Sequence, residues 1–456
     1  MRLSSRLSVV AAVATAGLVP TLTTSAAAAL APHTRPAASR ASITSGTAPL
    51  WAAQFKGTVG DTAGYADAVS PDGSMVFVTG NSGSSTIRLH NVGVTLAYNS
   101  ATGTVLWQTR YNPTFAHNAH FNDVAVSPDG SMVFVTGQLQ VATSGSDINA
   151  ITAAYNASTG AQVWANVDQT MRAGNSITVS PDGSTVFVAG GGQDPVVAYS
   201  ATTGTVLWSQ SSGVSEGVSA AASPDGSAVY VAGGSTVAAY NAATGAVLWS
   251  GPAGPTTTGG LTVSPDGSKV FITGTSYTPT NNGSYYATAA FDAASGATLW
   301  TANFQKPRSF GGASAVAVSL DGSKVFVTGS MYGRASTTIR WGTVAYDAST
   351  GTQLWVVRFP NLSDTIQGTA NAVSPDGSKV FVTGLTPGRS GDDYGTAAYD
   401  ASTGALLWIG SYTRPGFTGI GRSVAVSPDG SKVFTAGAIF KNGGLPTFMV
   451  TLAYNS

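Results

Sequence analysis

The stretch AYDASTGALLW, residues 398–408, decides the fold because the chain repeats it. Near-copies of it end at six other tryptophans, which are Trp107, Trp164, Trp208, Trp249, Trp300 and Trp355. In each copy an aromatic residue leads into a small polar turn with a glycine, and a tryptophan closes the motif. Repetition of this kind indicates an array of like structural units that share one continuous core.

The motif itself predicts a β-hairpin. Residues 396–400, TAAYD, read as a strand, and residues 406–408, LLW, begin the next one. Asp400 opens the turn because its short side chain bonds nearby backbone N–H groups. Gly404 supplies the positive φ that such a turn requires.

A second motif, SPDG, precedes each copy. Proline presets the backbone at the second turn position, aspartate bonds its neighbouring backbone, and glycine accepts a positive φ. Apolar and β-branched residues flank it, as in VAVSPDGSKVFTAG at 424–437, so each copy predicts an antiparallel hairpin. The motif begins at Ser70, Ser127, Ser180, Ser223, Ser264, Ser374 and Ser427, and a variant with Leu320 in place of proline begins at Ser319.

Counting the hairpins predicts the architecture. Two hairpins in each unit of roughly 40 to 57 residues match the four-stranded blade of a β-propeller. There are eight SPDG-type hairpins but seven tryptophan motifs, and the last unit stops at TLAYNS. The segment PLWAAQF at 49–55, with Trp51, precedes the first hairpin. We therefore predict an all-β protein with a single eight-bladed propeller of antiparallel blades over 47–456. Residues near 48–56 would be the fourth strand of the last blade, closing the ring and removing an open edge.

These repeats resemble a known family. AxDxxxGxxxW resembles the repeat of pyrroloquinoline-quinone-type propellers, the quinoprotein dehydrogenase-like fold, and SPDGSxVFV resembles the first hairpin of surface-layer and lactonase-type repeats in secreted bacterial proteins. The resemblance implies that one tryptophan per blade docks that blade onto its neighbour. The tryptophans with this implied structural role are Trp51, Trp107, Trp164, Trp208, Trp249, Trp300, Trp355 and Trp408.

Composition narrows the classes of partner. Charged residues make up 9% of the chain and the net charge is zero, so no overall field favours nucleic acid or an anionic membrane. There is no cysteine, which excludes disulfides, thiolate metal sites and cysteine nucleophiles. We expect a monomer without a membrane span.

The first 46 residues predict export. Residues 1–29 have the features of a signal peptide: Arg2 and Arg6, then a short apolar stretch, then small residues that suit cleavage. Residues 30–46 are rich in Pro, Ala, Ser and Thr and read as a flexible linker. We therefore expect a secreted, extracellular protein.

The binding face is predicted from the loops. Both hairpin turns of a blade should lie on one face of the ring, and they hardly vary. The connections between the second and third strands, and those between blades, should lie on the opposite face, and they vary in length and composition. They are short in the third and fourth blades, at 191–195 and 233–235, so the rim should be low there and admit an elongated ligand.

Candidate binding residues lie near this face and along the central channel. Most aspartates belong to turns, but a few polar residues come just before the first strand of a blade or in variable loops. These channel and rim candidates are Asp67, Asp123, Ser176, Glu216, Asn371 and Arg422. Trp341 lies in a variable stretch, RASTTIRWG, where packing is the favoured role and ligand stacking the alternative.

A histidine cluster offers the one candidate metal site. His117, His120 and Asp123 recur at three-residue spacing in NPTFAHNAHFND, and imidazole plus carboxylate suits zinc or another divalent metal. The segment should be a loop, and solvated or hydrogen-bonded histidines are the favoured interpretation.

Basic residues gather in the later blades, where they allow an anionic ligand or are simply solvated. They are Lys306, Arg308, Arg334, Arg340, Arg358, Arg389, Arg414 and Arg422.

Three functional hypotheses follow. The favoured one is a non-catalytic binding or scaffold protein that uses its variable-loop face and channel to bind a protein, glycan or cell-wall component. The second is an enzyme, either a metal-assisted hydrolase of lactonase type or, less favoured, a quinone-dependent oxidoreductase. The resemblance implies a quinone and a calcium for the latter, but adjacent cysteines are absent and the calcium motif has no match, so we do not expect pyrroloquinoline quinone. The third is an assembly scaffold, because the repeat also resembles the propeller that serves outer-membrane protein insertion.

Overall fold

The computed structural model describes most of the chain from residue 47 onward. The described residues are 47–57, 61–84, 90–111, 113, 116–141, 147–193, 195–211, 213–214, 218–278, 283–304, 311–332, 339–359, 367–387, 392–412, 414–441, 444 and 446–456. The predicted signal segment 1–29 and linker 30–46 lie outside them. A bilayer-spanning helix is absent from these described residues.

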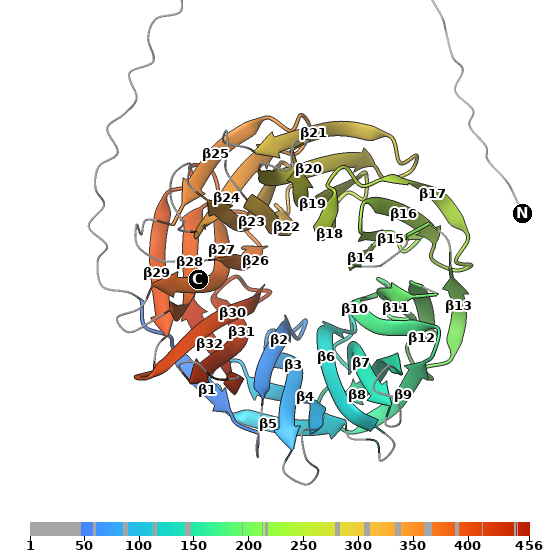
Figure 1. Ribbon diagram of the computed structural model, residues 1–456, viewed down its shortest axis with the longest axis vertical. Helices are drawn as coiled ribbons and strands as arrows, with labels where there is room; N and C mark the ends of the chain where they lie inside the picture. Colours follow the sequence, from blue (N-terminus) through green and yellow to red (C-terminus); the bar gives the residue numbers. More distant parts are fainter. Residues whose placement is uncertain are drawn as a thin grey trace, which may run out of the picture. The chain divides into compact units, whose positions relative to one another are not determined.

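In these ranges, thirty-two strands form eight four-stranded antiparallel sheets, which confirms the predicted eight-bladed propeller. Figure 1 shows the sheets arranged as blades around one axis, with one strand of each blade innermost. We number the blades 1 to 8 in chain order, starting with the sheet β2-β3-β4-β5.

Each strand position recurs in all eight blades. The innermost strands are β2 (Thr62–Val69), β6 (Ala116–Val126), β10 (Met171–Val179), β14 (Ser219–Ala222), β18 (Thr257–Val263), β22 (Gly311–Val318), β26 (Gly368–Val373) and β30 (Phe417–Val426). The second strands are β3 (Met75–Ser84), β7 (Met132–Val141), β11 (Thr185–Gly192), β15 (Ala228–Gly233), β19 (Lys269–Tyr277), β23 (Lys324–Tyr332), β27 (Lys379–Pro387) and β31 (Lys432–Lys441). The third strands are β4 (His90–Asn99), β8 (Ile148–Asn156), β12 (Val196–Ser200), β16 (Thr236–Asn241), β20 (Ser284–Asp292), β24 (Ile339–Asp347), β28 (Asp392–Asp400) and β32 (Pro446–Asn455). The outer strands are β5 (Val105–Tyr111), β9 (Gln162–Asp168), β13 (Val206–Gln210), β17 (Val247–Pro252), β21 (Thr298–Phe304), β25 (Gln353–Arg358), β29 (Leu406–Tyr412) and β1 (Trp51–Phe55).

The ring closes as predicted. Strand β1, the N-terminal strand, pairs antiparallel with β32 from Trp51 opposite Ala453 to Phe55 opposite Met449. Blade 8 is therefore built from both ends of the propeller, as the blue β1 beside the red β32 shows in Figure 1. This pairing covers the edge of β32 that would otherwise be open.

The SPDG turns are fixed by their own side chains. In the first copy, the Ser70 hydroxyl donates to Asp72 Oδ1 at 2.6 Å and accepts from the Met75 N–H at 2.9 Å. The same carboxylate accepts from the Ser74 N–H at 3.0 Å. These bonds lower the pKa of Asp72 to about 2, with the Ser70 hydroxyl as the largest cause. The Ser100 N–H donates to the Ser74 carbonyl at 2.9 Å, so both turns of a blade lie at the same end of its strands.

The tryptophan motif joins neighbouring blades. Trp208 in blade 3 donates its Nε1–H to the Ala242 carbonyl of blade 4 at 2.9 Å, and its ring lies 6.4 Å from the Tyr240 ring. The motif glycine of the next blade lies under the indole. In the copy at 398–408 this glycine is Gly404 of blade 7, which has φ of 74° and lies under Trp355 of blade 6. A Cβ at Gly404 would stand 2.9 Å from Trp355 Cδ2. The recurring AYxxxxGxxxW spacing thus places each tryptophan over the glycine of the following blade.

A contact between consecutive SPDG turns also runs around the ring, with one break. A Cβ built at Gly73 would lie 3.4 Å from Pro428 Cδ of the preceding blade. The corresponding position Gly377 has nothing within 4 Å, because its neighbour carries Leu320 in place of proline. Leu320 is 64% exposed. Sequence variation at one turn therefore leaves one gap between blades 6 and 7.

Candidate functional site: the bulge belt and the blade 3 pocket

The two faces of the ring differ as the sequence predicts. The short connection of blade 4 is a tight turn in which Gly233 pairs with Thr236, and the Thr236 hydroxyl donates to the Gly233 carbonyl at 3.1 Å. In blade 3, β11 ends at Gly192 and β12 begins at Val196. The rim opposite the SPDG turns is therefore low over these two blades.

The innermost strands carry bulges at equivalent positions. In seven of the eight described innermost strands, one residue is skipped in the pairing with the second strand, five positions before the serine of the SPDG-type turn. Bulges of this kind re-aim a side chain and often lie beside functional sites. We call these residues the bulge belt: Tyr65, Asn122, Asn175, Gly259, Ser314, Thr369 and Arg422.

Contacts link one half of the bulge belt from blade to blade. Thr369 of blade 7 donates to the Gly421 carbonyl of blade 8 at 2.6 Å. The Arg422 guanidinium lies over the Tyr65 ring of blade 1, 4.6 Å from its centroid. Tyr65 in turn lies 6.2 Å, ring to ring, from His120 of blade 2.

The linked half continues into blade 3. Asn122 donates from Nδ2 to the Gly174 carbonyl at 2.9 Å, one residue before the next belt member, Asn175. Figure 1 shows that the strands concerned, β26, β30, β2, β6 and β10, are consecutive around the axis. The opposite side has small belt residues, Gly259 and Ser314. The belt is therefore bulky and polar over one arc and small over the other.

The candidates Asp123 and Ser176 lie in the seams between innermost strands. Asp123 Oδ2 accepts from the Ile177 N–H of blade 3 at 2.9 Å, and Oδ1 accepts from the Val124 N–H at 2.9 Å. Burial raises the pKa of Asp123 to about 6, and these hydrogen bonds offset only part of that rise. Ser176 Oγ accepts from the Ala220 N–H of blade 4 at 3.3 Å. Both side chains thus hold adjacent blades together.

Asp67 and Asn371 occupy the same position in their blades, each next to a bulge. The Asn371 Nδ2 donates to the Phe326 carbonyl of blade 6 at 2.9 Å. Asp67 keeps some exposure as a residue, but both carboxylate oxygens are buried without a partner in normal hydrogen-bonding geometry among the described residues. Burial raises the pKa of Asp67 to about 7, and nearby Ser423 lowers it by less. The seam between blades 8 and 1 therefore contains a carboxyl group that favours its neutral form.

The histidine cluster is a strand and not the expected loop. Residues His117, His120 and Asp123 all belong to β6, whose pairing has bulges at both 117 and 122. The His120 ring is half-buried against Tyr65, and burial lowers its pKa. Within the described side chains, no group of three histidines or carboxylates could hold a metal ion, and the side chain of His117 lies outside the description.

The two rim candidates have different outcomes. Glu216 lies outside the described residues. Trp341 is in strand β24 and not in a loop, fully buried and stacked 5.0 Å from the Phe359 ring. A Cβ at Gly368 of blade 7 would lie 3.0 Å from Trp341 Cδ1, so the indole fills the seam between blades 6 and 7. Its environment matches the packing interpretation, because a buried ring does not face a ligand on the rim.

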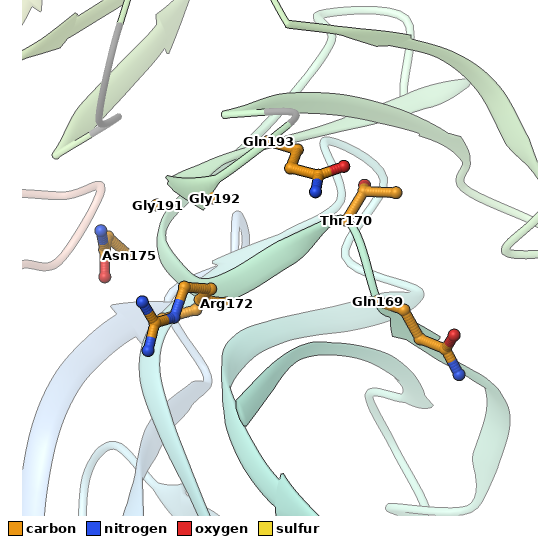
Figure 2. Close-up of a pocket in the computed structure, with 8 residues that line it drawn as sticks. Gln169, Thr170, Arg172, Asn175, Gly191, Gly192 and Gln193 are labelled. Atoms are coloured by element: carbon orange, nitrogen blue, oxygen red, sulfur yellow. The ribbon is translucent and has the colours of Figure 1, made fainter. Parts of the chain in front are cut away.

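A pocket of about 630 Å³ opens on the low rim of blade 3. Its walls come from the start of β10, the preceding connection and the end of β11, as Figure 2 shows. Arg172 and Asn175 are two of its lining residues, and both are bulge residues of β10. In Figure 2 Arg172 and Asn175 lie toward one end of the pocket, while Thr170 and Gln193 lie toward the other.

Comparison with known protein families agrees with this architecture. The family profile described as outer membrane protein assembly factor BamB, of the pyrroloquinoline-quinone repeat type, matches residues 148–289 and again 286–445. Together these matches cover more than half of the chain. The protein belongs to this BamB family. The resemblance to quinone-type propellers, drawn from AxDxxxGxxxW, is thereby confirmed.

Solved structures share the fold at low identity. Sqt1 of Chaetomium thermophilum, bound to the N-terminus of the ribosomal protein L10, is 14% identical with a TM-score of 0.61, covering 88% of this chain and 98% of that one. The C-terminal WD40 domain of Sif2 is 14% identical with a TM-score of 0.58, over 88% and 98%. Kuenenia stuttgartiensis hydrazine synthase is 15% identical with a TM-score of 0.50, over 70% and 94%. Among curated proteins nothing matches significantly. At these identities the likeness shows the fold alone.

Sequence reasoning missed most of the bulge belt in this BamB family member. It singled out Arg422 but not Tyr65, Asn122, Asn175 or the nearby Arg172. The available signal was positional, since each belt residue stands five places before the serine of its SPDG-type turn. Aligning the eight repeats on that serine groups these residues, but it does not show that they are skipped in the strand pairing.

Proposed function

We propose that this protein is a non-catalytic binding protein that captures a polypeptide segment of a partner protein on its variable-loop face, at the blade 3 pocket and the adjoining axis. The observation that carries the proposal is the pocket itself. It lies where the rim is low, and its lining groups include exposed side chains that offer hydrogen bonds, such as Arg172 and Gln193. Side-chain amides and a guanidinium match the donors and acceptors of a peptide main chain.

The use of the described acidic groups supports binding over catalysis. The SPDG aspartates are held by serine hydroxyls and backbone N–H groups within their turns. Asp123 caps a backbone N–H of the next blade, and Asp67 is enclosed in a seam. The SPDG aspartates and Asp123 thus hold turns and blades together, and Asp67 is enclosed away from a ligand.

Related proteins support a protein partner. The family takes its description from an outer membrane protein assembly factor, which suggests protein interactions. Sqt1, which shares the fold, is seen with the N-terminus of another protein bound to it. We further propose, from residues 1–29, that the protein acts outside the cell after export, where a glycan or cell-wall component is the alternative partner.

Phage display of random dodecapeptides against the exported form tests the proposal. Gln193→Trp places a bulky indole at the exposed edge of the pocket, and Ala243→Trp places the same ring on an exposed turn of the opposite face. We expect peptides to be enriched on the wild-type protein and on Ala243→Trp, and to be lost on Gln193→Trp. Absence of enrichment, or enrichment that Gln193→Trp leaves unchanged, would refute the proposal.

A further inference from the structure

Two arginines mark the ends of one arc around the ring axis. Arg172 lies in a second bulge of β10, and Arg422 lies in the bulge of β30. The innermost strands β30, β2, β6 and β10 follow one another between them (Figure 1). Two bulges in β10 lie three residues apart, at Arg172 and Asn175, and both residues line the pocket (Figure 2).

Neither guanidinium is neutralised by the described part of the chain. No carboxylate among the described residues lies within ion-pair distance of Arg172 or Arg422. Arg172 is exposed. The nearest innermost-strand carboxyl groups are turned elsewhere, because Asp123 bonds backbone N–H groups in a seam and Asp67 is buried. Asp168 beside the pocket accepts from the Thr170 and Met171 N–H groups and from the Tyr199 hydroxyl. Among the described residues, the two arginines of the arc therefore have no paired carboxylate.

The Arg422 side chain is held in position for an anion. Its guanidinium lies 4.6 Å over the Tyr65 ring, and stacking on an aromatic face leaves the N–H groups at the guanidinium edge free to donate. Tyr65 is itself supported by His120 at 6.2 Å. A supported arginine loses less conformational freedom when it binds a carboxylate, so it binds more tightly.

Glycine lets the end of β11 approach the start of β10 closely at the pocket wall. Gly192 has φ of 144°, and a Cβ there would stand 2.5 Å from the Thr170 carbonyl oxygen, so a side chain does not fit. Gly191 and Gly192 pair with Ala173 and Met171 of β10, and they add no side chain to the pocket lining. Amide side chains at Asn175 and Gln193 border the same space.

We propose that this arc binds an extended acidic peptide segment, with one carboxylate paired to Arg172 at the pocket and another to Arg422 at the axis. The inference rests on the proposed function and names the chemistry of its partner. Arginine pairs with carboxylate through two parallel hydrogen bonds, and its charge selects anionic residues. The exposed Gln193 amide in the same pocket as Arg172 favours a peptide over an acidic glycan, because it matches a main-chain N–H and C=O.

Fluorescence anisotropy of labelled peptides tests this pairing. The probes are a peptide of four Gly-Ser-Glu repeats, its Gly-Ser-Gln counterpart and a labelled polygalacturonate fragment. The variants are Arg172→Gln, Arg422→Gln and the conservative Arg172→Lys. Lys269→Gln on the SPDG face is the matched control, because it also removes one positive charge. Thermal unfolding of each variant checks that the ring is intact.

We expect the glutamate peptide to bind at least tenfold more tightly than the glutamine peptide, and more weakly as salt increases. Arg172→Gln and Arg422→Gln should each lower that affinity about tenfold, Arg172→Lys by less, and Lys269→Gln not at all. Equal binding of both peptides, unaffected by the arginine variants, would overturn the acidic preference while leaving polypeptide binding intact. Binding of polygalacturonate through the same arginines, with neither peptide bound, would overturn both proposals. If no probe binds, this inference fails, and the phage selection decides the proposed function independently.

Discussion

Replacing Asp67 by asparagine should stabilise the ring at neutral pH and remove part of its pH dependence. The carboxylate oxygens of Asp67 are buried without a normal hydrogen-bond partner among the described residues, and burial raises its pKa from 3.8 to about 7. Asparagine is nearly the same size and carries no charge. Blade 7 already has asparagine, Asn371, at the equivalent position.

The magnitude follows from linkage between protonation and folding. In the unfolded chain Asp67 loses its proton near pH 3.8, whereas in the folded ring it keeps the proton until about pH 7. Below pH 3.8 both states are protonated and the group has no pH-dependent effect. Between these values the folded state binds more protons, so stability falls as pH rises, and above pH 7 the loss is constant. Because one pKa unit is worth 1.36 kcal/mol, this difference in pKa corresponds to a loss of at most about 4 kcal/mol in the free energy of unfolding.

Denaturant unfolding of the wild type and Asp67→Asn at a series of pH values from 4 to 8 measures this effect. The two proteins should be similar at pH 4, and the variant should be more stable by a few kcal/mol at pH 8. Asp123 also has a raised pKa, but it is present in both proteins and cancels in the comparison. A stability difference that does not change between pH 4 and pH 8 would refute the reasoning.

The repeat supplies a reciprocal control. Asn371→Asp places a carboxyl group at the equivalent position between blades 6 and 7, where Asn371 Oδ1 is also buried and has no hydrogen-bond partner among the described residues. This variant should be less stable than the wild type, and increasingly so as pH rises from 4 to 7. If Asn371→Asp shows no such trend, burial at this position is not what raises the pKa of Asp67.

Three further predictions concern the ring itself. Leu320→Pro should stabilise the protein by about 0.4 to 1 kcal/mol in denaturant unfolding, because seven equivalent turns carry proline and the proline side chain would fill the gap at Gly377. A destabilised variant would show that this turn differs from the others. Trp208→Ala should cost about 3 to 5 kcal/mol, since the indole is 9% exposed and packs on Tyr240; a loss under about 1 kcal/mol would contradict blade docking. Deleting residues 47–56 should sharply lower the melting temperature by unpairing β32, and an unchanged melting temperature would contradict ring closure through β1.

The architecture could be predicted because local rules and repetition agree. SPDG and AYxxxxGxxxW each specify a hairpin through residues that lie within one turn, so no distant contact is needed to recognise them. Their unequal counts, eight and seven, then require the N-terminal PLWAAQF to complete the last blade, as the pairing of Trp51 with Ala453 shows. Because the repeats align with one another, the strands located in one blade also locate the strands of the other blades.

The site could be predicted only in part, because its residues are defined by what neighbouring blades do. The sequence predicts a binding face on the variable loops, which stays a prediction, and it correctly indicates short connections in blades 3 and 4. It wrongly predicts a loop for the segment with His117 and His120, which is strand β6. Bulges hide the true strand there, since each skipped residue interrupts the alternation that identifies a strand.

What the sequence by itself determined is the number, order and closure of the blades, because these depend on turns and repeats encoded within a few residues of each other. Only the tertiary structure decided the roles of the polar residues near the axis. The carboxylate oxygens of Asp67 are buried in the seam between blades 8 and 1, and the Ser176 hydroxyl accepts a hydrogen bond from blade 4. The Arg422 guanidinium lies over the Tyr65 ring. Each of these roles depends on groups that neighbouring blades bring together. Burial and pairing across such seams are properties of the closed ring, which no single repeat contains.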